Sequence, residues 1–265
     1  MTDASIGFER AARLYDATRG FSPDVAQAVA AVFAVAARLA PTSRVLEIGV
    51  GTGRIALPLA PAVARFIGID IARPMLDVLV EKRADERIDL CVADATRLPF
   101  ADASFDATLA IHVLHLIPGW RAAVAELGRV VRPGGTVLVN GRDHLEREPL
   151  NVEWNAIRAA HGIPFQGTAV GVEDTDRIAD ALTAAGFTER EAGTAAAWTS
   201  SVTPAHYLAD LERRAWSSTW SAPEEPYQAA LADLRAYLAR ERIPLDEPLA
   251  TTRHFRYLAF RRPAM

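Results

Sequence analysis

The residues of this sequence best placed to do chemistry are a glycine-rich loop and an aspartate that follows it. Three glycines alternate with other residues directly after an apolar segment: Gly49, Gly51 and Gly53. Glycines at the end of a buried strand permit a tight turn, and their missing side chains let backbone N–H groups approach a ligand. Asp70 ends the next apolar segment. A carboxylate there can accept hydrogen bonds from both hydroxyls of an adenosine ribose, so the pattern predicts a nucleoside-binding site.

Two other interpretations of the loop are open. The fingerprint of dinucleotide-binding enzymes has its third glycine one position later, where this chain has Arg54. That residue argues against a nicotinamide-dependent oxidoreductase. The second alternative is a glycine turn that serves only strand–helix packing. The order strand, loop, helix, strand and Asp70 favours a ligand site over that alternative.

The segments around the loop alternate between strand-like and helix-like patterns. Apolar runs predict strands at residues 44–49, 65–70, 88–93, 105–111 and 136–140. Apolar residues at helical spacing predict helices at residues 54–64, 74–84 and 120–131. Such alternation requires right-handed crossovers and a parallel sheet. The central region is therefore predicted to be a doubly wound α/β unit.

The flanks of this unit are predicted to be mainly helical. Residues 8–40, 173–185 and 204–241 have helical patterns, and two prolines interrupt the last of these. Residues 143–172 look irregular or mixed. Residues 254–261 alternate between apolar and polar side chains, which is typical of a closing edge strand.

Five sets of residues carry a resemblance to a known family. They are Val45-Leu46-Glu47-Ile48-Gly49-Val50-Gly51-Thr52-Gly53, Gly68-Ile69-Asp70-Ile71 with Pro74-Met75-Leu76, Ala93-Asp94-Ala95 with Leu98-Pro99-Phe100, Ser104-Phe105-Asp106, and Leu127-Gly128-Arg129-Val130-Val131-Arg132-Pro133-Gly134-Gly135. Together they resemble the motifs of class I S-adenosylmethionine-dependent methyltransferases, in particular the small-molecule branch grouped with the ubiquinone and menaquinone methyltransferases. The resemblance covers residues 40–142. We match residues 143–250 to no subfamily of known substrate.

The resemblance implies S-adenosylmethionine as the cofactor and assigns its contacts. Glu47 would lie beside the cofactor's amino group, and Asp70 would hold its ribose. Asp94 would cap the adenine amino group, although a turn cap is an alternative role for this residue. The other cofactor residues implied are Gly49, Gly51 and Gly53 behind the methionine part, Ile71, Met75 and Ala95 around the adenine, and Ile111 and His112 beside the sulfonium.

The resemblance continues weakly through the N-terminal segment Tyr15-Asp16-Ala17-Thr18-Arg19. Tyr15 and Arg19 are four residues apart on a predicted helix and therefore share one face. The resemblance implies that this segment folds over the cofactor, with Tyr15 near the sulfonium and Arg19 near the carboxylate. The alternative is an ordinary surface tyrosine and arginine.

Methyl transfer from a sulfonium is an in-line displacement that needs a nucleophile aligned about 3 Å from the methyl carbon. Where the nucleophile carries a proton, a nearby group must accept it. His112, His115 and Tyr15 are the candidates. His112 can instead line the pocket, and His115 can instead serve packing. Positioning alone can supply much of the acceleration, so the sequence does not require a base.

A metal site is not predicted. His112, His115, Asp143 and His144 have no further ligand at a diagnostic spacing. Asp143 and His144 follow the fifth strand, where they either face the substrate or lie in an exposed loop.

Composition excludes several classes of protein. The chain has 265 residues, of which 50% are hydrophobic and 23% charged, and its formal net charge is −4. This balance is typical of a globular chain and gives no field that would attract nucleic acid. One cysteine, Cys91, excludes an internal disulfide and favours the cytoplasm. Neither a membrane span nor a signal peptide is expected, because the longest apolar run is residues 28–37 and the N-terminus lacks basic residues.

The sequence thus predicts a Rossmann-like, mostly parallel seven-stranded sheet with an antiparallel last strand, a helical N-terminal lid and helical insertions. We expect one domain, divided into a lid (1–40), a cofactor-binding core (41–142), substrate-side insertions (143–172 and 200–250) and a closing strand (251–265). We expect transfer of a methyl group to oxygen of a small molecule by a monomer or homodimer. The alternatives are transfer to nitrogen or carbon, or a non-catalytic cofactor-binding protein that acts through a partner.

Overall fold

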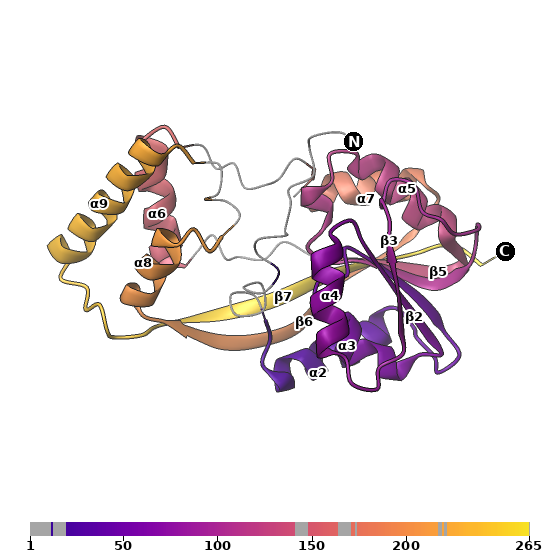
Figure 1. Cartoon of the computed structure of the whole chain (residues 1–265). Coiled ribbons are helices and arrows are strands. Elements are labelled where there is room, and N and C mark those ends of the chain that lie inside the picture. Colours follow the sequence, from indigo (N-terminus) through magenta and orange to yellow (C-terminus); the bar gives the residue numbers. More distant parts are fainter. Residues whose placement is uncertain are drawn as a thin grey trace. The chain divides into compact units, whose positions relative to one another are not determined.

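The fold is built on one seven-stranded sheet. A computed structural model describes residues 12, 20–140, 148–163, 171–172, 174–216, 219 and 222–264. The strand order is β3-β2-β1-β4-β5-β7-β6 (Figure 1). The strands are β1 (Arg44–Ile48), β2 (Arg65–Asp70), β3 (Ile88–Val92), β4 (Phe105–Ala110), β5 (Val131–Asn140), β6 (Glu189–Val202) and β7 (Leu249–Arg261).

The central strands pair in parallel, and β7 runs antiparallel to β5. Side chains on both faces of β1 are buried, because helices cover both faces of a parallel sheet. Helix α2 (Pro23–Ala36) contacts α3 (Ala56–Leu59), while α5 (Trp120–Val130) contacts α7 (Thr175–Ala184). Figure 1 shows these two pairs on opposite sides of the sheet. The predicted Rossmann-like sheet with its antiparallel last strand is therefore confirmed.

The helix predicted over residues 54–64 is wrong in its extent. The chain forms only α3 and a 3₁₀ turn, η2 (Ala60–Ala62), in this region. Pro58 and Pro61 lack the N–H groups that would extend an α-helix. By contrast, α4 (Arg73–Lys82) begins with Pro74 in its first turn, where a proline is well tolerated.

Strand β5 begins five residues earlier than predicted. Phe105 pairs with Val131, but Ala107 pairs with Thr136, so the partner strand carries extra residues between these pairs. Gly134, with φ of 76°, lies in that irregularity. The Arg132-Pro133-Gly134-Gly135 segment was expected to be a turn, and it is a bulged strand entrance instead.

Seven strands were expected, but no residue range was predicted for strand β6. Its outer position in the sheet leaves most of its side chains exposed or half-buried, so it has no apolar run to signal a strand. Strand β7 also begins at Leu249, earlier than the expected residue 254. Its first residues are likewise mostly exposed or half-buried, which explains why the apolar pattern starts late.

The chain forms two compact units. Unit 1 comprises residues 1–142, 169–196 and 255–265, and unit 2 comprises residues 143–168 and 197–254. Unit 2 carries α6 (Pro149–Ala160), α8 (Pro204–Glu212) and α9 (Glu224–Arg240). Its core includes Trp154, Tyr207, Tyr227 and Leu231. Unit 2 is therefore made from the two parts of the chain that the sequence assigned to insertions.

Candidate functional site

The candidate site lies in unit 1, at the carboxyl ends of the parallel strands. From β1 the chain moves to β2 on one side, whereas β4 leads to β5 on the other. The order therefore reverses between β1 and β4, which are hydrogen-bonded neighbours. In open α/β sheets, ligands bind in the crevice outside such a reversal. The loops that follow β1, β2, β3 and β4 all begin at this edge.

The glycine loop after β1 has the backbone conformation that its residue types predicted. Gly49, Gly51 and Gly53 have φ values of 63°, 56° and 83°, which side chains disfavour. A Cβ atom on Gly49 would overlap the side chain of Val113, which follows β4. The loop therefore needs glycine both for its turn and for its close approach to the segment after β4.

Asp70 joins the glycine loop to the end of β2. Its Oδ2 atom accepts a hydrogen bond from the Gly51 N–H at 2.9 Å, and its Oδ1 atom accepts one from the Ala72 N–H at 2.8 Å. A carboxylate can accept about four hydrogen bonds, so each oxygen keeps further capacity. Burial raises the pKa of Asp70, while these backbone N–H groups lower it. The arrangement holds a carboxylate in place beside the loop with acceptor capacity to spare.

Glu47, near the end of β1, is the other acidic residue at this edge. It is 2% exposed, and its Oε2 atom has no hydrogen-bond partner among the described residues. Burial raises the pKa of Glu47 well above its ordinary value, although the positive charge of Arg54 opposes that shift. A buried carboxyl with an unused oxygen is costly unless a partner arrives. Its chemistry therefore suits a cationic group such as an ammonium.

Arg54 was considered in the sequence only as a residue that breaks a dinucleotide fingerprint. In the structure its guanidinium carbon lies 4.8 Å from the ring centroid of Phe21 and 5.7 Å from that of Phe255. Phe255 lies on β7, far away in the sequence, so no local spacing could have signalled this contact. Arg54 is the main described positive charge acting on Glu47, which makes it a site residue that the sequence reasoning missed.

The residues expected around the adenine lie in the segments that follow β2 and β3. The Ala93 N–H donates to the Asp70 carbonyl at 3.2 Å, which places the segment after β3 against the end of β2. Met75 and Ala95 are buried, while Ile71 is 57% exposed. Asp94 accepts hydrogen bonds at 2.8 Å from both the N–H and the hydroxyl of Thr96, so it does serve as a turn cap.

His112 lies two residues after the end of β4 and has a strained backbone. Its φ is 53°, an uncommon value for a residue with a side chain. The His112 N–H donates to Oδ1 of Asn140 at 2.8 Å, and its ring centroid lies 5.3 Å from that of Phe255. Ile111, beside it, is buried. Contacts from β5 and β7 thus fix His112 at the carboxyl edge.

His115 lies in a 3₁₀ turn, η3 (Leu114–Leu116), which does not include His112. The two histidines therefore do not share an α-helical face. The His115 carbonyl accepts a hydrogen bond from the Gly171 N–H at 2.9 Å. Its backbone thus ties a later segment of unit 1 to this turn.

Several predicted residues lie outside the described residues: Tyr15, Arg19, Asp143 and His144. Cys91 is described, half-buried on β3, and its thiol lies 3.6 Å from the neighbouring Val92 carbonyl. Within the described ranges, no group of three or more His, Cys, Asp or Glu residues could hold a metal ion. In the same ranges, no helix is both long and apolar enough to cross a membrane.

The sequence that forms this site matches a known protein family. Residues 46–139 match the family model described as a methyltransferase domain. This region is a class I methyltransferase domain. The predicted family is therefore confirmed for the part of the chain that carries the glycine loop, Asp70, Asp94 and His112.

Individual relatives agree with this assignment. Demethylmenaquinone methyltransferase of Renibacterium salmoninarum is 39% identical over 104 residues, which are 39% of this chain and 43% of that enzyme. The match thus spans less than half the length of that relative. Two solved structures share the fold. Phosphoethanolamine N-methyltransferase 2 of Haemonchus contortus, in complex with phosphomonomethylethanolamine and S-adenosylhomocysteine, has a TM-score of 0.56 and 20% identity, covering 96% of this chain and 57% of that one. The [4+2]-cyclase SpnF has a TM-score of 0.57 and 19% identity, covering 99% and 98%.

Proposed function

We propose that this protein binds S-adenosylmethionine at the carboxyl edge of unit 1 and transfers its methyl group to an oxygen atom of a small molecule. One observation carries the proposal. A methyltransferase domain presents a buried Glu47 with an unused oxygen, and Asp70 with spare acceptor capacity, on either side of its glycine loop. An ammonium and a ribose would satisfy these two groups.

The residues present fit this cofactor. Glu47 would accept from the amino group, Asp70 from the ribose hydroxyls, and the glycine loop would leave room for the methionine part. The other proposed contacts come from Ile71, Met75, Asp94 and Ala95 around the adenine, Ile111 and His112 near the sulfonium, and Tyr15 and Arg19 over the cofactor. When bound, the cofactor supplies an electrophilic methyl group.

The chain itself must position the acceptor and manage its proton. We assign His112 as the group that takes a proton from an acceptor hydroxyl, because Asn140 holds its backbone N–H and Phe255 packs against its ring. His115 is the weaker candidate for this role, because its turn is separate from His112. Tyr15 remains a third. Alignment of the acceptor would supply the rest of the acceleration.

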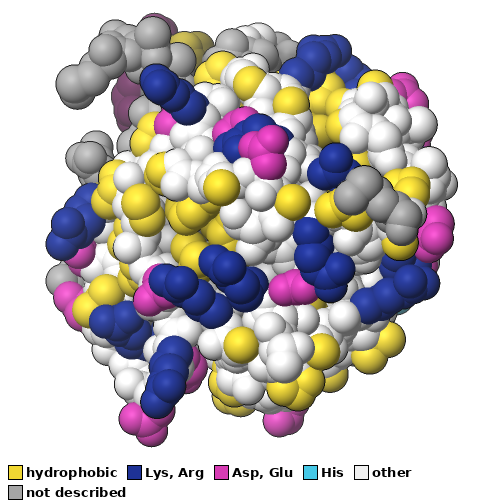
Figure 2. Space-filling view, turned by 90° about the vertical axis from the view of Figure 1, so that its right-hand side faces the viewer, with side chains coloured by type: hydrophobic (Ala, Val, Ile, Leu, Met, Phe, Trp, Pro, Cys, Tyr) yellow, Lys and Arg dark blue, Asp and Glu magenta, His cyan; other side chains and the backbone are white. Residues whose placement is uncertain are grey.

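A small molecule is the acceptor that charge and family favour. Figure 2 shows basic and acidic side chains interspersed on the face drawn, and the net charge is −4. Nucleic acid is bound through concentrated positive charge. Transfer to nitrogen or carbon is the alternative reaction. The single cysteine favours action in the cytoplasm, and we expect a monomer or homodimer.

Two other functions compete with this proposal. A non-catalytic protein that binds the cofactor and acts on a partner would keep Glu47 and Asp70 but need no base. A nicotinamide-dependent oxidoreductase would use the same sheet edge, although Arg54 stands where its fingerprint has glycine.

Calorimetry with the purified protein tests the proposal. We expect binding of S-adenosylmethionine and S-adenosylhomocysteine and none of NAD. A panel of phenols, alcohols, amines and activated carbon acids should then show methyl transfer, which mass spectrometry detects as a gain of one methyl group. Binding of NAD in place of the cofactor would overturn the proposal. Cofactor binding without transfer to any acceptor would favour the non-catalytic alternative.

A further inference from the structure

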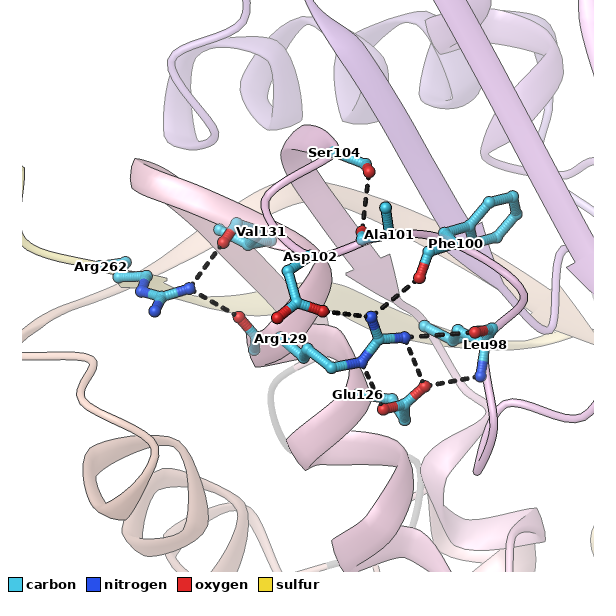
Figure 3. Close-up of polar contacts among 10 residues, drawn as sticks. Leu98, Phe100, Ala101, Asp102, Ser104, Glu126, Arg129, Val131 and Arg262 are labelled. Atoms are coloured by element: carbon cyan, nitrogen blue, oxygen red, sulfur yellow. Dashed lines mark hydrogen bonds and ion pairs between the residues drawn. The ribbon is translucent and has the colours of Figure 1, made fainter.

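A second polar cluster lies away from the proposed cofactor residues, where α5 meets the loop between β3 and β4. Arg129, near the end of α5, donates from Nε to Oε1 of Glu126 at 2.7 Å and from Nη2 to Oε2 at 2.8 Å. This two-point contact orients both side chains (Figure 3). Arg129 is 31% exposed and Glu126 is 19% exposed. The pair is thus partly shielded from water on a rigid helix.

The Glu126–Arg129 pair forms hydrogen bonds with the backbone of the neighbouring loop. Oε2 of Glu126 accepts from the Leu98 N–H at 2.7 Å, and Nη2 of Arg129 donates to the Leu98 carbonyl at 3.2 Å. Nη1 of Arg129 donates to the Phe100 carbonyl at 2.8 Å and to Oδ1 of Asp102 at 2.7 Å. Figure 3 shows the guanidinium between these loop groups and Glu126. Both polar groups of the Leu98 backbone are therefore held by α5.

The main chain of Arg129 adds another contact to the same loop. Its carbonyl accepts from the Ala103 N–H at 3.0 Å, and Ala103 has an unusual φ of 52°. Side chain and backbone of one residue therefore fix the loop at Leu98, Phe100, Asp102 and Ala103. The loop contains no helix or strand of its own to hold its shape.

The other end of this loop reaches the candidate site. The Ala93 N–H binds the Asp70 carbonyl, and the Arg97 N–H donates to the Asp94 carbonyl at 3.0 Å. Ala95 and Leu98 belong to one buried cluster. The segment from Ala93 to Leu98 is therefore short, packed and anchored at both ends, so a shift at Leu98 would move Asp94.

The Glu126–Arg129 cluster is not itself a ligand site. Both Glu126 oxygens accept hydrogen bonds, and Arg129 uses all three of its nitrogens on protein partners. The hydrogen bond from Arg129 lowers the pKa of Glu126, so the glutamate is charged at neutral pH. The cluster can only orient the loop that it holds.

We propose that Glu126 and Arg129 are positioning residues for the adenine end of the cofactor. They hold Leu98 and Phe100 so that Asp94 and Ala95 stand beside Asp70 in the orientation that selects an adenine. The cluster thus determines base specificity without touching the ligand. This inference rests on the proposed function, because it needs a cofactor that carries adenine at this edge.

Base specificity gives a readout that a purely structural role would not move. S-inosylhomocysteine replaces the adenine amino group of S-adenosylhomocysteine with a carbonyl oxygen and carries a hydrogen on N1 of the base, so donor and acceptor are exchanged at both positions. We expect the wild-type protein to prefer the adenosyl ligand by about tenfold or more in calorimetry. The variant Arg129→Lys keeps the charge but loses the planar fork. We expect its preference to fall to about threefold or less, with weaker binding of the adenosyl ligand.

Glu126→Gln is the second variant, because its amide oxygen still accepts from the Leu98 N–H while the paired charge is lost. We expect an intermediate loss of preference. Arg132→Lys is the matched control. Arg132 lies three residues after Arg129 and pairs with Asp106 at 2.6 Å rather than with the loop. It should keep the wild-type preference.

The outcomes separate the two proposals. If the wild-type protein discriminates between the ligands and folded Arg129→Lys and Glu126→Gln discriminate equally well, the positioning role is overturned and the proposed function stands. If Arg132→Lys loses the preference for the adenosyl ligand too, the positioning role is likewise overturned, because the loss would then not be specific to the Glu126–Arg129 pair. If the wild-type protein binds neither ligand, the proposed function fails and the positioning role fails with it.

Discussion

Two acidic side chains at the carboxyl edge of unit 1 differ from two tyrosine hydroxyls of unit 2 in their hydrogen bonding. At the edge of unit 1, the Oε2 atom of Glu47 has no described hydrogen-bond partner, and the Asp70 carboxylate accepts hydrogen bonds from the Gly51 and Ala72 N–H groups. In unit 2, the Tyr207 hydroxyl donates to Oδ1 of Asn151 at 2.7 Å. The Tyr227 hydroxyl donates to the Leu211 carbonyl at 2.7 Å.

Two half-buried charges of unit 2 also contact each other. Glu148 and Arg253, both in unit 2, form an ion pair at 3.0 Å. A hollow beside this pair and Tyr207 has room for about one water molecule. The Glu148–Arg253 pair and the two tyrosine hydroxyls therefore bond to other groups of unit 2. The Oε2 atom of Glu47 in unit 1 has no described hydrogen-bond partner, which costs stability and suits a ligand.

The largest expected effect is at Asp70. Asp70→Ala should weaken S-adenosylhomocysteine binding by about 1.5–3 kcal/mol, because it removes charge-assisted contacts to the ribose and the link to the Gly51 N–H. Calorimetry measures this. Asp89→Ala is the control, since Asp89 pairs with Arg65 on the exposed surface. Unchanged affinity in Asp70→Ala would contradict this comparison, because the free acceptor capacity of Asp70 would then not be used by the ligand.

Glu47→Gln should have effects of opposite sign on binding and on folding. Loss of the ammonium contact should weaken cofactor binding about tenfold. Removal of a buried charge should stabilise the ligand-free protein by about 1 kcal/mol at pH 8. Calorimetry and urea unfolding measure the two effects, and exposed Glu225→Gln on α9 is the control.

The sign of the pH dependence sharpens the Glu47 prediction. Burial raises its folded-state pKa, so the folded protein binds the proton more tightly than the unfolded chain. The stability that this provides is full below the unfolded pKa and is lost as the pH rises through the folded pKa. The gain from Glu47→Gln should therefore be larger at pH 8 than at pH 5. Equal gains at both values would contradict the buried, unpartnered state of Glu47.

Tyr207→Phe tests the other side of the comparison. It removes the hydrogen bond from the Tyr207 hydroxyl to Asn151 and should lower the free energy of unfolding by about 1 kcal/mol. Cofactor affinity should not change. Tyr237→Phe, on the same unit, is the control. A loss of cofactor affinity in Tyr207→Phe would show that the polar groups of unit 2 are not purely structural.

His115→Asn should give the smallest effect. The Gly171 N–H donates a hydrogen bond to the His115 backbone carbonyl, and the substitution keeps this bond. We expect cofactor affinity within about twofold of the wild-type value by calorimetry. A tenfold loss would place the His115 side chain in the site beside His112.

Local chemistry explains what could be predicted. Strands β1, β2, β3 and β4 have apolar runs that end close to the predicted residues, because buried parallel strands must be apolar on both faces. The glycine loop and Asp70 were identifiable because their spacing is set by one strand–loop–helix–strand unit. Strand β6 gave no such signal, since an outer strand with exposed faces has no need of an apolar run.

The sequence by itself determined the family, the sheet and the residues that lie on one strand or its following loop. Only the tertiary structure decided that Arg54 stacks on Phe255, that Asn140 holds His112, and that Glu126 and Arg129 hold the loop that carries Asp94. These contacts join residues that are distant along the chain, and their geometry depends on how strands and helices pack. The unused oxygen of Glu47 is likewise a tertiary property, because the packing of the strands and loops decides which described residues can reach it.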